Sequence, residues 1–316
     1  DEIVGRERPD ILESADPYQL GWKAAAISRR QRIPAVTFYH SDFAEAYLRP
    51  NVERLGRHAA AAVMTVAHRY VRELYNQFEV TITPSDQLAA QLREWGVRDV
   101  QVVGLGVNTE VFRPAAGDAP GTLRATYNIS RAARLLIYVG RLAPEKNTGT
   151  LFEVFELLTK RHPGRFHLLV IGDGQQRDSV LALQASTRSV TWLPYCADAA
   201  ELASLYRAAD LFVHPGTQET FGLVALESQA CGTPVVGIRG GAMEKIVFHD
   251  QSAWARQNSP QALADAVEDA MRFDLPAMGA AAAEAVAGRY AWREVFARLF
   301  CIYREVCAGY KRRAVE

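Results

Sequence analysis

Short apolar runs alternate with longer stretches of helical periodicity along nearly the whole chain. Residues 33–40 form an almost continuous apolar run, which is typical of a strand buried on both faces of a parallel sheet. Residues 52–77 then repeat apolar positions at helical spacing. Strict alternation of this kind predicts an α/β protein with parallel, doubly wound sheets, in which ligands bind at the carboxyl ends of the strands.

The first block of this pattern predicts four strands, at residues 10–14, 33–40, 78–83 and 100–106. Asp16 is expected to cap a helix that runs to about Gln31, with Pro17 at its first position. Ser85 is expected to cap another helix, and Gly96 to end it.

The second block predicts strands at residues 135–141, 166–171, 190–193, 211–214 and 234–238, with helices at 148–161, 175–187, 199–209 and 222–230. Residues 113–121, between the blocks, are rich in Pro, Gly and Ala, and they predict a linker. The expected domains are therefore residues 1–113, a linker at 114–121, a second domain at 122–289 and a C-terminal helix at 290–316.

Composition narrows the class of protein. Apolar residues make up 49% of the 316 residues, and Lys+Arg equals Asp+Glu at 36 each, so no overall field attracts nucleic acid or an anionic membrane. The four cysteines lack metal-ligand spacing, and reduced cytosolic thiols are expected. No apolar run reaches about 18 residues, so no membrane span is expected. The chain opens on Asp1, with neither a signal peptide nor a start methionine, and we expect a piece of something longer.

The segment from Glu219 to Glu227 carries the strongest chemical signal. An apolar strand leads into a turn with Gly222 and then a helix, whose free N–H groups form an anion site. Eight residues of helix rise about 12 Å, whereas two carboxylates acting on one glycosidic bond stand roughly 5 to 9.5 Å apart. The spacing favours two anchors for an elongated ligand, with a sugar at one end and a ribose at the other. The alternative is an ordinary crossover with solvated glutamates.

Further candidates follow other strands. Arg141 and Lys146 lie around the turn after residues 135–141 and are placed to flank a diphosphate, unless they pair with Glu145 or solvent. Gly172 and Gly174 end the next strand without the spacing of a dinucleotide fold, which disfavours nicotinamide binding.

In the first block, His40 ends a strand and is followed by Ser41 and Asp42, a polar group placed to face a cleft. The alternative is a hydrogen-bonded histidine at a strand end. No histidine or Asp-x-Asp spacing typical of a metal site is present, so no metal is expected. The arginines between residues 49 and 72 alternate with glutamates, which favours a solvated helix face over contact with lipid.

Together these motifs resemble the retaining glycosyltransferases of family 4, which have the GT-B fold. The matching residues, in family order, are 38–42, 83–85, 104–112, 138–142 with Glu145 and Lys146, 171–174, 219–227, 230–236, and Gly240, Gly241 and Glu244. The resemblance implies two Rossmann-like doubly wound domains facing a cleft. The first is expected to lack the strand and glycine-rich loop with which the family usually opens.

The resemblance also implies a role for each site residue. Arg141 and Lys146 would hold the donor diphosphate, Glu219 would hold the sugar, and His40 would contact the transferred sugar from the other domain. Glu227 would accept hydrogen bonds from the ribose hydroxyls. The implied donor-binding residues are Gly140, Gly172, Tyr195 beside the base, Phe221, Gly222, Leu223 and Glu227. No protein nucleophile, metal or cofactor is implied.

The expected activity is transfer of a hexose from a nucleoside diphosphate sugar to a lipid or glycan acceptor. GDP-mannose is the favoured donor and a UDP-hexose (for a glucosyl or sulfosugar transferase) the alternative. A GT-B epimerase and a nucleotide-binding module with little catalysis are rival interpretations. Nucleic acid is not an expected partner. A cytoplasmic location is expected, while peripheral contact at the inner face of the membrane and the oligomeric state are left open.

Overall fold

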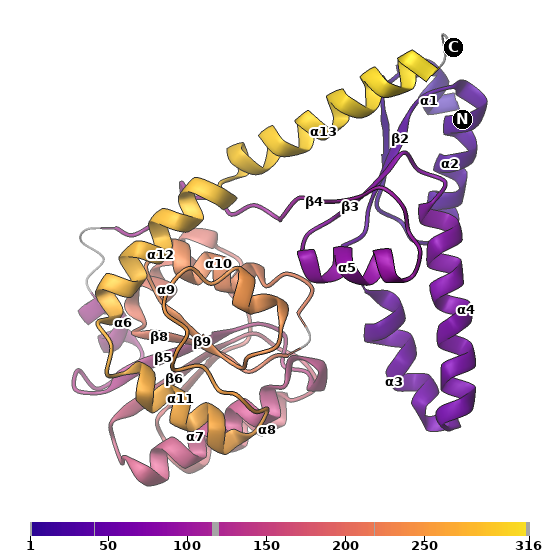
Figure 1. The fold of residues 1–316 in the computed structure, drawn as a ribbon. Helices are drawn as coiled ribbons and strands as arrows, with labels where there is room; N and C mark the ends of the chain where they lie inside the picture. The colour runs from indigo at the N-terminus through magenta and orange to yellow at the C-terminus, as the bar shows by residue number, and fades with distance from the viewer. Residues whose placement is uncertain (1, 41, 116–119, 218, 314–316) are drawn as a thin grey trace. The chain divides into compact units, whose positions relative to one another are not determined.

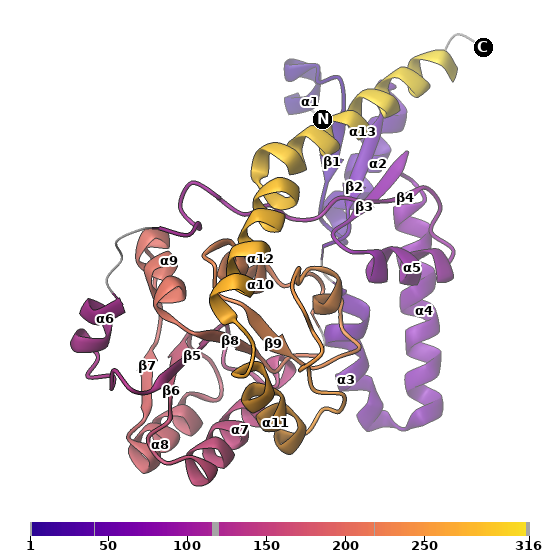
Figure 2. The same ribbon diagram turned by 60° about the vertical axis from the view of Figure 1, so that its left-hand side comes forward.

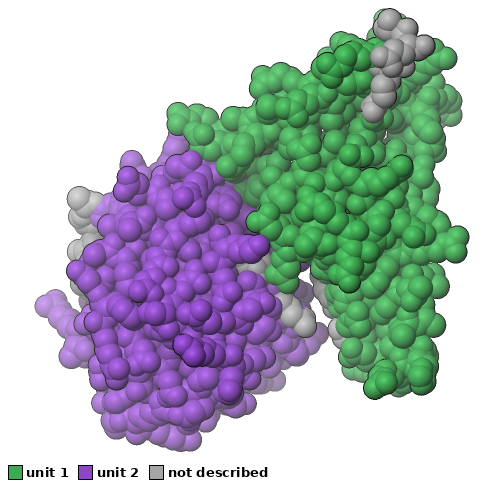
Figure 3. All heavy atoms as spheres, in the orientation of Figure 1, with its two compact units in different colours: residues 1–105, 293–316 green, residues 106–292 purple. Residues whose placement is uncertain are grey.

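A computed structural model describes residues 2–40, 42–115, 120–217 and 219–313. The chain forms two compact units, which Figure 3 colours separately. Unit 1 comprises Asp1–Leu105 and Arg293–Glu316, and unit 2 comprises Gly106–Trp292. Each unit is built on one parallel sheet.

Unit 1 contains a four-stranded sheet in the order β1-β2-β3-β4 (Figure 1). Its strands are Leu12–Ser14 (β1), Ala35–Phe38 (β2), Val80–Thr83 (β3) and Val100–Val102 (β4). Its helices are Glu2–Glu7 (α1), Gln19–Gln31 (α2), Arg49–Val52 (α3), Arg57–Tyr75 (α4), Asp86–Glu94 (α5) and most of Trp292–Arg313 (α13), with single turns at Ala44–Leu48 (η1) and Glu53–Leu55 (η2).

Two apolar cores cover the two faces of this sheet. On one face, α2, α4 and α5 contribute buried residues such as Ala25, Val71 and Leu92. On the other face, Val36 and Ile82 of the sheet pack against apolar residues of α13, namely Val295, Ile302 and Val306. These α13 residues recur at spacings of seven and four, which places them on one side of a helix. Both views of the ribbon show α13 alongside these strands (Figures 1 and 2).

The helix starts in unit 1 test the predicted caps. The Ser85 hydroxyl accepts a hydrogen bond from the Leu88 amide at 3.4 Å, and Gly96 follows α5 with φ +86°, so both predictions are confirmed. Asp16 also caps, because its Oδ2 accepts from the amides of residues 18, 20 and 21. However, α2 begins only at residue 19 and Pro17 precedes it.

The single helix expected at residues 52–77 is wrong in its first part. Gly56 adopts φ +93°, a left-handed conformation that ends η2 and precedes α4. Glycine has no Cβ and adopts a positive φ without the steric cost that other residues would meet. The chain can therefore turn at this point. Helical periodicity on either side of Gly56 concealed the break.

Unit 2 contains a five-stranded sheet in the order β7-β6-β5-β8-β9. Its strands are Arg134–Val139 (β5), Phe166–Ile171 (β6), Val190–Leu193 (β7), Leu211–His214 (β8) and Val235–Gly237 (β9). Its helices are Pro120–Thr126 (α6), Thr148–Arg161 (α7), Arg177–Thr187 (α8), Ala199–Ala208 (α9), Leu223–Ala230 (α10), Pro260–Ala270 (α11) and Leu275–Tyr290 (α12), with single turns at Pro144–Lys146 (η3) and Ala242–Lys245 (η4).

The strand order of unit 2 reverses beside β5. The chain steps from β5 outward to β7 and then returns to β8 on the other side of β5. Right-handed crossovers therefore place α7 and α8 on one face of the sheet and α9 and α10 on the opposite face. Helix α11 packs on α7, and α12 packs on α10, which completes the two outer layers (Figures 1 and 2). The reversal between β5 and β8 is where open α/β sheets bind ligands.

The division between the units differs from the predicted one. It falls between residues 105 and 106, ahead of the expected linker at 114–121, of which residues 116–119 lie outside the described part. The reason is packing: the Val107 amide donates to the Tyr290 carbonyl at 2.7 Å, so the segment after Gly106 already belongs to unit 2. The expected C-terminal helix continues into unit 1, and its residues 314–316 lie outside the described part. None of the helices in the described ranges is long and apolar enough to span a membrane.

Candidate functional site

Two loops meet at the carboxyl ends of the adjacent strands β5 and β8. Lys146 ends η3 in the loop after β5, and Glu219 lies in the loop after β8. Lys146 Nζ lies 2.6 Å from Glu219 Oε1, and His214 Nε2, at the end of β8, lies 3.5 Å from the same oxygen. The structure thus joins two predicted site residues, Lys146 and Glu219, at the point where the strand order reverses.

Glu219 is a buried carboxylate that is held in its charged form. Its side chain is 11% exposed. Burial raises its pKa, but hydrogen bonding and charge from His214, followed by Lys146, lower the pKa to about 2. Glu219 is therefore a fixed negative charge between two potential cations across the neutral pH range.

His214 is a site residue that the sequence interpretation passed over. It was treated only as the end of a strand, although His40 was singled out for the same position in the other block. Its side chain is buried, and a Cβ added at Gly216 would lie 2.9 Å from its Cε1. The useful signal was a polar ring that ends an apolar strand and is followed by Pro215 and Gly216, which let the chain turn back over it.

The N-terminus of α10 supplies amides beside Glu219. Gly222 is the residue before the helix, with φ +93°, and a Cβ there would lie 2.2 Å from Met243 Sδ. Phe221 is buried and Leu223 is exposed. The first amides of a helix lack intrahelical acceptors, so this end of α10 favours anions. The predicted helix at 222–230 is confirmed, but Glu219 precedes α10, so the rise of eight helical residues does not give its distance from Glu227.

Glu227 lies farther along α10 in a different setting. Its Oε2 accepts a hydrogen bond from the hydroxyl of Tyr206 in α9 at 3.2 Å. Burial raises the pKa of Glu227 to about 7, although the hydrogen bond from Tyr206 opposes the shift. Burial likewise raises the pKa of the Tyr206 hydroxyl well above its usual value. Near neutral pH, Glu227 is thus divided between its charged and neutral forms.

Glycines bring the loops after β5 and β6 into close approach. Gly172 has φ +141°, and a Cβ at this position would lie 1.9 Å from the carbonyl oxygen of Gly140. The two predicted glycines are therefore in contact, and no side chain fits between them. Arg141, which follows Gly140, forms an ion pair with Glu145 at 3.0 Å, and its side chain is largely exposed. This is the alternative that the sequence left open for Arg141.

The loop after β7 presents aromatic groups at the same edge of the sheet. Tyr195 is 80% exposed. Trp192, in β7, donates from its Nε1 to the carbonyl oxygen of Gly172 at 2.8 Å. The guanidinium of Arg177, the first residue of α8, lies 4.9 Å from the centroid of the Trp192 ring. The sequence interpretation named Tyr195 but not the other two.

The candidates in unit 1 have a separate geometry. His40 is exposed after β2, and its ring lies 6.1 Å from that of Phe38. Asp42 is buried: it accepts from the Tyr39 hydroxyl at 2.9 Å and from Gln91 Nε2 at 2.8 Å, and burial raises its pKa. The expectation that Asp42 faces a cleft is therefore wrong, because both of its oxygens are used inside the unit. Ser41 lies outside the described residues, and the role of His40 stays a prediction.

Two of the arginines between residues 49 and 72 form ion pairs with glutamates of unit 1. Arg49 Nη2 donates to Glu45 Oε1 at 2.9 Å, and Arg69 Nε lies 2.7 Å from Glu73 Oε1. Within the described ranges, no group of three or more His, Cys, Asp or Glu residues is arranged to hold a metal ion. The predicted independence of metal stays a prediction.

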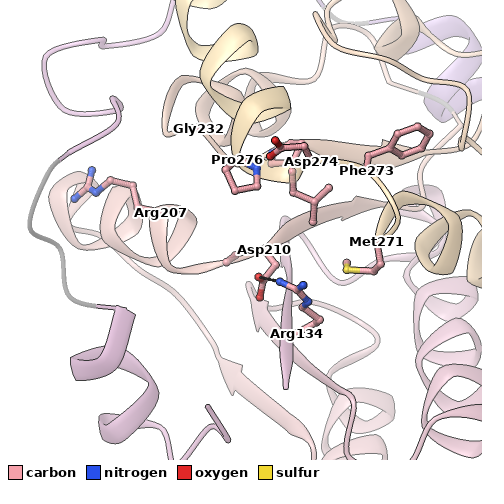
Figure 4. A pocket seen from close by; sticks show the side chains of 11 residues that line it. Arg134, Arg207, Asp210, Gly232, Met271, Phe273, Asp274 and Pro276 are labelled. Atoms are coloured by element: carbon pink, nitrogen blue, oxygen red, sulfur yellow. Dashed lines mark hydrogen bonds and ion pairs between the residues drawn. The ribbon is translucent and has the colours of Figure 1, made fainter. Parts of the chain in front are cut away.

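Unit 2 also has a cavity of about 480 Å³ at the opposite edge of its sheet (Figure 4). Arg134, Asp210 and Pro234, which line it, stand at the amino ends of β5, β8 and β9. Arg134 pairs with Asp210 at 3.0 Å, and Asp274 caps α12. Its polar groups are thus engaged in structural contacts, and none of the predicted site residues lines it.

Comparison with known proteins gives the family. Residues 122–283 match the model described as glycosyl transferases group 1, and residues 1–111 match the model described as glycosyltransferase family 4. Among curated relatives, a GDP-mannose-dependent alpha-mannosyltransferase of Corynebacterium glutamicum is 31% identical over 76% of this chain. A D-inositol 3-phosphate glycosyltransferase of Thermobispora bispora is 32% identical over 91% of this chain. The alignments span 53% and 68% of these two relatives.

A solved structure supports the fold. HepE of Anabaena in complex with UDP superposes with a TM-score of 0.76 and 20% identity, over 96% of this chain and 81% of its own. At that identity the likeness concerns the fold alone. It confirms the predicted GT-B fold with two parallel-sheet α/β domains.

Proposed function

The chain belongs to the family 4 glycosyltransferases, and on that premise we propose that it transfers a hexosyl group from a nucleoside diphosphate sugar to an acceptor hydroxyl. The observation that carries the proposal is the cluster of Lys146, Glu219 and His214 at the strand reversal of unit 2, next to the N-terminus of α10. A fixed anion between potential cations, beside helix amides, is a site prepared for a charged, hydroxyl-rich ligand.

The donor diphosphate would bind by exchange of ion pairs. Lys146 is neutralised by Glu219 and Arg141 by Glu145 in the free protein. A diphosphate offers both cations more negative charge than one carboxylate does, so it would compete for them. Arg141 would bring its planar fork from the surface, and Lys146 a point charge from the interior. The contact between Gly140 and Gly172 would let the phosphates lie against backbone.

The two glutamates would hold the two sugars of the donor. Glu219 is charged and accepts hydrogen bonds only, so the hydroxyls of the transferred hexose are suitable donors. The amides of Phe221, Gly222 and Leu223 would hold the same hexose or its phosphate. Glu227, whose only recorded side-chain partner in the described part of the chain is Tyr206, would accept from the ribose hydroxyls. Tyr195 would stack on the base.

The proposed chemistry needs no nucleophile from the protein. The bond between the anomeric carbon and the β-phosphate oxygen breaks, and the departing phosphate keeps the electron pair. The acceptor oxygen bonds to the same carbon on the same face, and its proton passes to the departing phosphate, so the configuration is retained. Arg141, Lys146 and the α10 amides would stabilise the charge that develops on the diphosphate.

The favoured donor is GDP-mannose, which is supported by the name of one relative, the Corynebacterium enzyme. A UDP-hexose is the second candidate, for the glucosyl or sulfosugar transfer that the sequence motifs leave open. A lipid or glycan hydroxyl is the proposed acceptor class, and the proposed setting is the cytoplasm. The alignments cover only part of the relatives, so these assignments are proposals for the whole protein.

The test is a two-stage panel. Thermal unfolding is first measured with GDP, UDP, ADP and their sugars, because a ligand at 100 times its Kd stabilises by about 2.7 kcal/mol. The protein is then incubated with the donor that stabilises it most and with glycerolipids or simple glycosides as acceptors. Hexosylated product is detected by mass spectrometry. Stabilisation by no nucleotide in the panel would contradict the proposal.

A further inference from the structure

We propose that Arg177, held over the indole ring of Trp192, reads the nucleobase of the donor and selects guanine over uracil. The inference rests on the proposed function, because it assumes that a nucleoside diphosphate sugar binds at the carboxyl edge of unit 2. It assigns a specificity role to two residues outside the family motifs quoted above.

The position of the base follows from the order of the loops. Lys146 follows β5 and Glu219 follows β8, so a donor with its diphosphate at Lys146 and its hexose at Glu219 lies across the carboxyl ends of these two strands. On the other side of β5 the sheet continues with β6 and then β7, and the exposed ring of Tyr195 stands in the loop after β7. The nucleoside, which lies on the other side of the diphosphate from the hexose, therefore extends toward these loops. Its base then lies near the loops after β6 and β7.

Arg177 is the cation built into this edge. It is the first residue of α8, directly after the loop that follows β6. Its guanidinium lies 4.9 Å from the centroid of the Trp192 ring, within the range of a cation–π contact. The Asp173 carboxylate is 3.7 Å away, which is longer than a hydrogen bond, and the Arg177 side chain is 54% exposed. The Trp192 ring thus orients the Arg177 guanidinium, and the side chain stays accessible to a ligand from solvent.

Trp192 is fixed in its turn. Its Nε1 donates to the Gly172 carbonyl oxygen at 2.8 Å, and the Gly172 amide donates to Leu193 at 2.9 Å. Gly172 also touches Gly140, so the Trp192 ring is anchored to the two loops against which the diphosphate is proposed to lie. An arginine on a fixed ring loses less conformational freedom when it binds than one on a free side chain.

The chemistry of the fork favours guanine. The five N–H donors of arginine match two acceptors side by side, and guanine offers O6 and N7 in that arrangement. Adenine presents a donor next to its N7, and uracil offers no such pair. Tyr195 can stack on any base, so discrimination between bases has to come from a hydrogen-bonding group such as the Arg177 guanidinium. Trp192 acts here as a positioning residue for Arg177.

The experiment measures dissociation constants by calorimetry on the full chain, for GDP, inosine diphosphate, 7-deaza-GDP and UDP. For the wild type we expect GDP and inosine diphosphate to bind alike, since both have O6 and N7, and both to bind roughly tenfold or more tightly than UDP. Loss of N7 in 7-deaza-GDP should weaken binding severalfold. In Arg177→Ala, the preference for GDP over UDP should fall by at least about tenfold, and 7-deaza-GDP should bind like GDP.

The matched control is Arg165→Ala. Arg165 also lies over an aromatic ring, 5.6 Å from the centroid of Phe166, but at the amino end of β6. Its replacement should leave the ratio of GDP to UDP affinity unchanged. Trp192→Leu, checked for folding by its thermal transition, should reduce the ratio as Arg177→Ala does.

Two results overturn the inference and leave the proposed function standing. One is a wild type that binds UDP or ADP more tightly than GDP. The other is equal loss of GDP and UDP affinity in Arg177→Ala, which would assign the residue to the phosphates or the ribose. Failure of every nucleoside diphosphate to bind would contradict the proposed function itself.

Discussion

Glu219 and Glu227 stand eight residues apart in one loop–helix segment, and both are shielded from water, yet their surroundings drive them in opposite directions. Lys146 and His214 flank Glu219, and the pKa of Glu219 is lowered to about 2. Glu227 has only the neutral hydroxyl of Tyr206 as a recorded partner within the described ranges, and burial raises its pKa to about 7. The same side chain is a fixed charge in one place and a titrating group in the other.

The difference indicates two uses for a carboxylate in a donor site. A carboxylate that is already ionised needs no change of protonation to hold the hexose while the diphosphate departs. A carboxylate that lacks compensation becomes fully charged only when a ligand donates hydrogen bonds to it. We therefore expect Glu219 to act in the transfer step and Glu227 to act mainly in donor affinity.

The largest expected effect is on transfer in Glu219→Gln. The amide keeps the shape but removes the charge that accepts hydrogen bonds from the hexose hydroxyls, so turnover should fall by at least about a hundredfold, the range seen when one preorganised group is lost. GDP affinity should change by only a few fold. Glu156→Gln is the control, because Glu156 pairs with Lys160 on the surface of α7 at 3.8 Å. Loss of GDP affinity as large as the loss of turnover would break the contrast.

Lys146→Ala should have the next largest effect, on binding of the diphosphate. Removal of a charge-assisted contact costs about 1.5 to 3 kcal/mol, which corresponds to a roughly tenfold to hundredfold loss of GDP affinity. Guanosine affinity should hardly change. Calorimetry with both ligands makes the measurement, Arg141→Ala should follow the same pattern, and Lys160→Ala should alter neither. Equal weakening of guanosine would show that Lys146 supports the fold rather than the phosphates.

The contrast predicts a dependence of GDP affinity on pH. As pH rises from 6 to 8, Glu227 loses its proton and accepts ribose hydroxyls better, so GDP affinity should rise several-fold more in the wild type than in Glu227→Gln. Ionisation of GDP itself is common to both proteins. Tyr206→Phe removes the hydrogen bond that lowers the pKa of Glu227, so its profile should move to higher pH. Parallel profiles for all three proteins would refute the assignment.

The contrast also predicts an effect of pH on stability. The pKa of Glu227 in the folded protein, about 7, exceeds the ordinary glutamate value of 4.5. Its contribution is therefore fully present below pH 4.5 and is lost as pH rises through 7, by up to roughly 3 kcal/mol. The free energy of unfolding of the wild type relative to Glu227→Gln should fall between pH 4.5 and 8. A constant difference would mean that Glu227 titrates normally.

Elements with a strong local signal were predicted from the sequence. Helix α7 and the strands β6, β7 and β8 match their predicted bounds, because their apolar runs are long and their flanking breakers are clear. The turn at Gly56 and the helices α11 and α12 were missed. Helix α12 is nearly apolar all round, so it shows little periodicity.

The sequence predicted which residues form the site better than it predicted the contacts between them. Motif order brought Lys146, Glu219 and Glu227 together as candidates. The ion pair between Lys146 and Glu219 joins residues 73 apart, and no local pattern specifies such a pair. The opposite pKa shifts arise from burial together with His214 and Lys146 at Glu219 and Tyr206 at Glu227. Tyr206 lies 21 residues before Glu227, in α9, so only the tertiary structure brings it to that carboxylate.

The most direct test is a carboxylate titration by carbon-13 NMR, with and without saturating GDP, using Glu219→Gln and Glu227→Gln to assign the two signals. In the free protein we expect one carboxylate with a pKa near 2 and another near 7. Saturating GDP should lower the pKa of Glu227, because ribose hydroxyls stabilise its charged form, while Glu219 stays ionised throughout. If GDP binds and the pKa of Glu227 does not move, the ribose lies elsewhere and the proposed donor site is wrong.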